Sequence, residues 1–164
     1  YPFIDVFTQM YYKTMNRLNS DKYLYFNDSY FKNSFKNLKP DHFIVYYNEI
    51  PIASSICIMS EKYYHYHLGA SNSNYLDLRP NNILFDTMIK RAKNNGCEIL
   101  NLGGGVSGKI DDSLLDYKKK FSKNTDEFYI GKRIHIQNVY DQVIEQWKNK
   151  NNNKEINILL GYRI

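Results

Sequence analysis

The stretch that decides the fold is residues 63–105, "YYHYHLGASNSNYLDLRPNNILFDTMIKRAKNNGCEILNLGGG". Its first part, 63–70, is predicted to be a strand. Residues 79–96 have the periodicity of a helix, and Gly96 stands where a left-handed C-terminal cap belongs. The apolar run 97–102 is predicted to be a second, buried strand. Because a helix carries the chain back, we expect the two strands to run parallel.

The segments before this stretch extend the sheet. Two β-branched and aromatic runs, 42–47 and 52–59, are separated by turns so short that they predict an antiparallel meander. Two helices are predicted before them, over 1–19 and 27–37. The first helix has apolar residues in steps of three and four, namely Ile4, Phe7, Tyr11, Met15 and Leu18.

The segments after it are predicted to be a helix over 111–122 capped by Asp111 or Asp112, a strand over 127–136, and a helix over 139–150. A final strand is expected from Ile156 onward. The whole pattern predicts an α/β (α+β) fold with a mixed sheet, an antiparallel meander followed by a parallel crossover, and helices on both faces. We expect one domain over 1–164.

Composition limits the partners. The 164 residues carry a net charge of +5, and the pI is about 9.0, which favours anionic partners. Cys57 and Cys97 are expected to be buried free thiols, and no Cys/His motif indicates a metal site. No run of residues is apolar and long enough to span a membrane, and no signal peptide is visible. We therefore expect a cytoplasmic protein.

The glycines from Gly103 to Gly108, followed by Lys109, have the spacing of a nucleotide-binding P-loop. A P-loop needs Ser or Thr after the lysine to hold Mg²⁺, and Ile110 stands there instead. The helix also begins several residues too late to face a phosphate. We therefore predict no ATP or GTP binding, and one alternative is that the glycines only form a tight turn.

Two segments resemble the GNAT acyltransferase superfamily, and more closely its FemABX branch, whose members build peptidoglycan cross-bridges. They are 65–105, with "LGAS" and "LGGG" after its two strands, and 111–136, "DDSLLDYKKKFSKNTDEFYIGKRIHI". This resemblance implies a GNAT-like sheet and an acyl donor as co-substrate, with no tightly bound cofactor.

This sequence departs from the acyl-CoA-dependent members at the loop 71–81, "SNSNYLDLRPN", which lacks their glycine-rich motif. The FemABX branch lacks that motif because its donor is an aminoacyl-tRNA. The chain also begins at a helix where such proteins have an earlier strand and an N-terminal half. The resemblance therefore implies an N-terminal domain or partner subunit.

In GNAT proteins the two central parallel strands splay apart, and the donor pairs with backbone freed there. The resemblance, with the small residues at these positions, indicates donor-binding residues at the ends of both strands. They are Leu68, Gly69, Ala70, Ser71, Asn101, Gly103 and Gly104. Asn101 has an alternative role, which is to cap the glycine turn.

The predicted catalytic residues are Tyr117, Lys118 and His67. The resemblance implies an aromatic-lysine pair at 117 and 118, with Tyr117 as general acid and Lys118 contacting donor or acceptor. His67 is a candidate general base because histidine titrates near neutrality. The alternatives are that Tyr117 is a core aromatic, that Lys118 to Lys120 form a solvated face, and that His67 is structural.

These features lead to three functional hypotheses. The first is an N-acyltransferase domain that moves an acyl or aminoacyl group onto a primary amine of a cell-wall or polysaccharide precursor, with a lipid-linked precursor as one candidate. The second is a CoA-dependent N-acetyltransferase. The third is a non-catalytic domain that binds tRNA or another polyanion.

Overall fold

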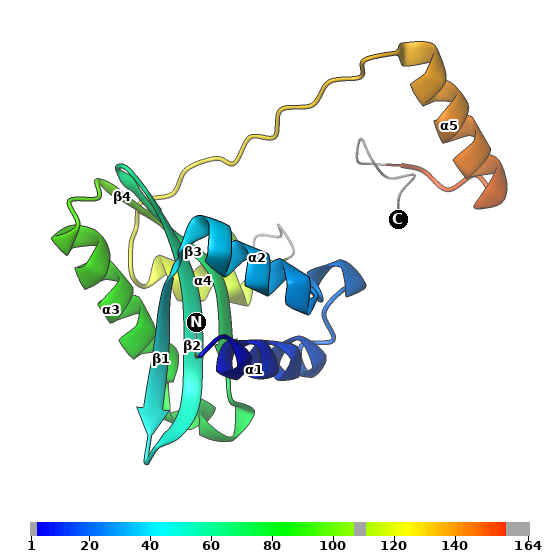
Figure 1. Cartoon of the computed structure of the whole chain (residues 1–164). Helices are drawn as coiled ribbons and strands as arrows, with labels where there is room; N and C mark the ends of the chain where they lie inside the picture. The colour runs from blue at the N-terminus through cyan, green and yellow to red at the C-terminus, as the bar shows by residue number, and fades with distance from the viewer. Residues whose placement is uncertain (1–2, 107–110, 157–164) are drawn as a thin grey trace. The chain divides into compact units, whose positions relative to one another are not determined.

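The computed structural model describes residues 3–106 and 111–156 (Figure 1). They form two compact units, of which the first ends at Lys123 and the second begins at Asn124. Each unit is described by itself below. The expectation of one domain over 1–164 stays a prediction.

The first unit follows the predicted order of helices and strands. Its elements are α1 (Ile4–Arg17), α2 (Asp28–Leu38), β1 (Asp41–Tyr47), β2 (Ile50–Ser60), β3 (Tyr63–Ser71), α3 (Pro80–Asn94), β4 (Ile99–Asn101) and α4 (Ser113–Lys119). Short 3₁₀ helices lie at Lys22–Leu24 and Ser73–Leu78. Gly96 has a φ of 72°, which is the left-handed conformation expected after α3.

The strands form one mixed sheet in the order β1-β2-β3-β4. The first two pairings are antiparallel, and β3 pairs with β4 in parallel, as predicted. Only three residue pairs join β3 to β4, from Tyr63↔Ile99 to His65↔Asn101. The strand predicted over 97–102 is thus shorter than expected, because its pairing stops at Asn101. The prediction that it is buried is wrong, because β4 lies at the edge of the sheet and Ile99 and Asn101 are exposed.

A β-bulge in β3 changes which side chains face each helix layer. Ile56 of β2 pairs with Leu68, and the next residue, Cys57, pairs with Tyr66, so His67 is an extra residue. A bulge of this kind shifts the alternation of side chains between the two faces. Tyr66 therefore packs in the cluster beneath α3, whereas Leu68 packs in the cluster beneath α1.

Helices cover both faces of the sheet, as predicted, with α1 and α2 on one face and α3 on the other (Figure 1). The core beneath α1 and α2 contains Phe7, Met10, Tyr11, Met15, Phe31, Phe35, Ile56 and Ala70. The core beneath α3 contains Ala53, Cys57, Tyr64, Leu84, Phe85, Met88 and Ala92. Leu18 was expected on the buried face of α1 but is exposed, because it follows the last residue of that helix. Cys57 is buried as expected, while Cys97 is only partly buried.

The second unit contains α5 (Gln137–Lys150), where a helix was predicted. The strand predicted over 127–136 is wrong, since these residues have no regular structure. A strand needs a neighbour for its backbone N–H and C=O groups, and the described part of this unit has no second strand. The side chain of Phe128 is 88% exposed. The predicted final strand lies, beyond Ile156, outside the described residues.

Among residues 3–106 and 111–156, no helix has the length and apolar character needed to cross a membrane.

Candidate active site

The candidate site begins where β3 and β4 part. The ladder between them ends at His65 and Asn101, while β3 continues to Ser71 and pairs there with β2 on its other side. The predicted donor-binding residues of β3, from Leu68 to Ser71, all lie beyond the end of the ladder. The two parallel strands therefore part toward their C-terminal ends, as the resemblance to GNAT proteins implied.

The turn after β4 is held by a side chain. Gly103 has a φ of 71°, in the left-handed region that favours glycine, and its N–H donates to Oδ1 of Asn101 at 2.7 Å. Asn101 therefore caps the glycine turn, which is the structural alternative for this residue. That bond leaves the amide nitrogen of its side chain as a donor.

Asp112 ties this turn to α4. Its Oδ1 accepts from the N–H groups of Leu114 and Leu115, both at 3.0 Å, as the predicted helix cap. Its Oδ2 accepts from the N–H of Val106 at 2.6 Å. The turn passes so close that a Cβ on Gly105 would lie 2.3 Å from the Asp112 carboxyl carbon. The carboxylate thus fixes the glycine turn and the start of α4 together.

Lys118 reaches the gap between the parting strands. Its Nζ donates to the carbonyl of Gly104 at 2.7 Å and lies 5.6 Å from the ring centroid of Tyr66, the first β3 residue beyond the ladder. Only 8% of Lys118 is exposed, whereas Lys119 and Lys120 are exposed. Burial lowers the pKa of Lys118, and the negative charge of Asp112 opposes that shift. The solvated-face alternative therefore does not describe Lys118.

Tyr117 is both a packed aromatic and a hydrogen-bond donor. Its ring meets that of Phe85 of α3 edge-to-face, with 5.4 Å between centroids. Its hydroxyl donates to Oδ1 of Asn82, in the first turn of α3, at 3.0 Å. Burial raises the pKa of Tyr117, so the hydroxyl keeps its proton at neutral pH.

Gly69 is required by the side chain of Tyr66. A Cβ at residue 69 would lie 1.8 Å from the Tyr66 hydroxyl oxygen. The tyrosine therefore lies against the backbone of its own strand, three residues further on, and only glycine leaves room for it. Burial raises the pKa of Tyr66 and keeps this hydroxyl protonated.

His67, the third predicted catalytic residue, faces the α2 side. Its Nε2 is 2.6 Å from the hydroxyl of Tyr30 in α2, and its ring centroid is 6.2 Å from that of His65. The pKa of His67 is lowered by burial and then by the charge of His65. The pKa of His65 is lowered by burial and then by the charge of Lys118. Both imidazoles are therefore neutral near pH 7.

The structure brings Lys118 together with Gly103 and Gly104 and packs Tyr117 against α3, while it places His67 in the bulge, on the side of the sheet that α2 covers. Sequence reasoning did not select Tyr66 or Tyr30 as neighbours of the site. It selected Asp112 only as one of two candidates, with Asp111, for the helix cap. The two tyrosines carry no local signal, because the bulge and the helix packing decide what they meet.

Among the described residues, no group of three or more His, Cys, Asp and Glu side chains is arranged to hold a metal ion. Lys109 and Ile110, on which the prediction against a P-loop rests, lie outside the described residues.

The sequence and the fold of this chain were compared with those of known proteins. The sequence profile of the FemAB family matches residues 41–140. A transcriptional regulator from Bacillus halodurans C-125 has a similar fold, with a TM-score of 0.58 and 13% identity over 82% of this chain and 94% of its own. An aminoglycoside N-acetyltransferase, AAC(6')-Iy, in complex with CoA, matches with a TM-score of 0.49 and 9% identity over 78% of this chain and 92% of its own. No curated protein sequence matches.

Proposed function

The chain belongs to the FemAB family, and from that premise we propose that it is an N-acyltransferase domain whose donor is an aminoacyl-tRNA. The acceptor is a primary amine of a cell-wall or polysaccharide precursor, and a lipid-linked precursor is one candidate. The family match confirms the expected place in the acyltransferase superfamily. The proposal goes further than the family match in four respects, which are the identity of the donor, the identity of the acceptor, a cytoplasmic location, and an N-terminal domain or partner subunit.

The observation that carries the proposal is the parting of β3 and β4, with the Lys118 ammonium at the opening. Residues 66–71 extend past the end of the β4 ladder, so an acyl donor can lie along their backbone. A positive charge in a partly desolvated gap stabilises the negative charge that develops on a carbonyl oxygen under attack. The proposed donor-binding residues remain those at the ends of both strands, namely Leu68, Gly69, Ala70, Ser71, Asn101, Gly103 and Gly104.

The proposed reaction uses both sides of the gap. The acceptor amine attacks the ester carbonyl carbon of the donor and forms the new C–N bond. A neutral His67 takes the proton that the amine loses, consistent with its lowered pKa. The tetrahedral intermediate then collapses and breaks the C–O bond to the tRNA. Tyr117, held protonated by its raised pKa, gives a proton to the leaving oxygen.

One feature favours aminoacyl-tRNA over acyl-CoA as donor. The segment after β3 is a 3₁₀ helix, Ser73–Leu78, where a CoA-dependent enzyme needs free backbone N–H groups for a pyrophosphate. Here the N–H groups of Tyr75 and Arg79 are bonded to Asn72 and Leu76. A loop whose amides are bonded internally offers fewer donors to CoA.

The test is acyl transfer by the natural full-length protein. Aminoacyl-tRNA or acetyl-CoA, each labelled in the acyl group, is incubated with an amine-bearing cell-wall precursor, and labelled amide is measured. We expect product from aminoacyl-tRNA and a large loss of rate in Lys118→Ala. Product from acetyl-CoA alone would support the second hypothesis. Tight tRNA binding without any amide would support the non-catalytic one and overturn the proposal.

A further inference from the structure

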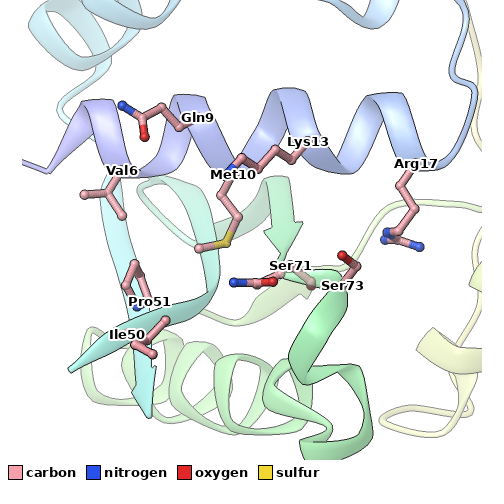
Figure 2. A pocket seen from close by; sticks show the side chains of 10 residues that line it. Val6, Gln9, Met10, Lys13, Arg17, Ile50, Pro51, Ser71 and Ser73 are labelled. Atoms are coloured by element: carbon pink, nitrogen blue, oxygen red, sulfur yellow. The ribbon is translucent and has the colours of Figure 1, made fainter. Parts of the chain in front are cut away.

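A pocket of about 200 Å³ lies apart from the strand gap, between α1 and the C-terminal end of β3 (Figure 2). Its walls come from α1, from Ile50 and Pro51 at the start of β2, and from the turn 71–73 after β3. Figure 2 shows Met10 pointing from α1 into the pocket and Arg17 on the side of Ser73. None of these residues belongs to the catalytic or donor-binding set except Ser71.

The floor of this pocket is fixed by buried hydrogen bonds. The N–H of Ser71 donates to Oγ1 of Thr14 in α1 at 3.0 Å. The hydroxyl of Ser71 donates to Oδ1 of Asn81 in α3 at 3.0 Å. Ser71 is 7% exposed and Thr14 is 6% exposed. Both neighbouring helices therefore hold the backbone of this turn at Ser71, which reduces the ordering cost of binding on that side, while the side chains of Lys13 and Arg17 are exposed.

The charge of the lining is entirely positive. Lys13 and Arg17 both line the pocket, and no Asp or Glu does. They are four residues apart on α1, so they are neighbours on one helix face, where like charges repel. The ion pairs among the described residues use Lys62, Lys90 and Arg91, and none includes Lys13 or Arg17. A bound anion would remove the repulsion.

Neutral donors complete the lining. Oδ1 of Asn72 accepts from the N–H of Asn74 at 3.1 Å, which leaves its amide nitrogen as a donor. The hydroxyl of Ser73 lines the same side of the pocket. The lining thus offers four kinds of hydrogen-bond donor, namely a guanidinium, an ammonium, an amide and a hydroxyl. A ligand with three or more acceptor oxygens can use more of these donors than a carboxylate, which has only two oxygens.

We infer that this pocket binds a phosphate group, held between Lys13 and Arg17 of α1 and contacted by Asn72 and Ser73. The phosphate is part of a substrate of the acyl transfer. The identity of that substrate rests on the proposed function, whereas the binding of a phosphate group to this pocket does not. Two bearers share this chemistry, namely the acyl donor and a phosphate-linked acceptor. The site lies at the end of β3, from which a phosphate-bearing substrate can extend toward the strand gap.

The test uses inorganic pyrophosphate as the probe, at constant ionic strength, with binding followed by amide chemical shifts of the ¹⁵N-labelled chain. We expect the largest shifts at Arg17 and Ser73. Lys13→Gln and Arg17→Gln should each raise the dissociation constant about tenfold or more, as expected for a lost charge-assisted bond. Lys36→Gln, at an exposed lysine of α2, is the matched control and should change little.

An equal loss of pyrophosphate affinity in all three variants, or no loss of affinity in either α1 variant, would overturn the inference. So would acetate binding as tightly as pyrophosphate. An RNA oligonucleotide with the sequence of a tRNA acceptor stem, and uridine diphosphate, then identify which substrate carries the phosphate, since only the probe that carries the recognised phosphate should lose affinity in Arg17→Gln. If this protein binds pyrophosphate as expected but catalyses no acyl transfer, the proposed function is wrong and the inferred phosphate site still stands.

Discussion

The ammonium of Lys118 donates to the carbonyl of Gly104 across 2.7 Å, so a side chain of α4 holds the turn that ends β4. The same ammonium lies 5.6 Å from the ring centroid of Tyr66 on β3. One buried positive charge therefore lies between the middle of β3 and the turn that ends β4, at the point where the two strands separate. Any ligand that enters the gap along β3 approaches this charge.

Lys118→Ala should lower kcat/KM for acyl transfer by about ten- to a hundredfold, because a charge-assisted contact in a desolvated gap contributes roughly 1.5–3 kcal/mol. The variant should also lose some stability, since the bond to Gly104 is removed. Lys120→Ala is the matched control, exposed and on the same short segment. Kinetics and urea unfolding of both variants check this, and equal small effects would show that Lys118 has no special role.

Gly69→Ala should destabilise the protein by about 1–3 kcal/mol, because the new methyl group overlaps a packed tyrosine. The shortest overlap is with the Tyr66 hydroxyl oxygen, at 1.8 Å, and the next is with its ring carbon Cζ, at 2.8 Å. Tyr66→Phe should therefore restore part of the lost stability in the double variant but not all of it. Urea unfolding of the two single variants and the double variant measures this coupling. Strictly additive effects would contradict the contact.

Asp112→Ala should cost about 1–2 kcal/mol of stability, as the loss of a helix cap does. It should also loosen the glycine turn, because the same carboxylate accepts from the N–H of Val106. Asp112→Asn keeps an acceptor for the helix and should cost less. Asp111→Ala, at the exposed neighbouring residue, is the control. Hydrogen exchange of the Val106, Leu114 and Leu115 amides should rise only in the Asp112 variants.

Stability should fall as the pH falls below about 6.5, partly because of His42. This imidazole lies 2.8 Å from the Ser54 hydroxyl and packs against the rings of Phe7 and Phe35. Burial lowers the pKa of His42 to about 4. The folded protein therefore keeps it neutral while the unfolded chain takes up a proton, so its contribution is full above pH 6.5 and is lost on acidification.

Between pH 7.5 and 5.0, one such histidine accounts for at most about 2 kcal/mol of lost stability, because the slope reaches roughly 1.4 kcal/mol for each pH unit only below its ordinary pKa of 6.5 and the partial exposure of the imidazole reduces the effect. The lowered pKa values of His65 and His67 act in the same direction. Urea unfolding at pH 7.5 and 5.0 measures the loss, which should be smaller in His42→Gln and unchanged in His135→Gln. An identical pH dependence in both variants would rule out His42 as a source.

The sequence alone predicted the helices and strands of the first unit, their order and the parallel crossover. These features follow from local patterns, since apolar periodicity reports on neighbours within one turn or one strand. A helix cap at Asp111 or Asp112 and the left-handed Gly96 were predicted for the same reason, and the structure has the cap at Asp112. The segments "LGAS" and "LGGG" also indicated the family whose profile matches residues 41–140.

Only the tertiary structure decided the features that depend on distant partners. Residues 127–136 have the composition of a strand but lack a neighbouring strand in the described part of their unit, so propensity alone did not produce one. The bulge at His67 depends on pairing with β2, and it places that histidine opposite α2 rather than beside Lys118. Burial of Lys118 depends on the turn after β4. The pocket between Arg17 and Ser73 joins residues far apart in sequence, because packing of α1 on the end of β3 brings them together.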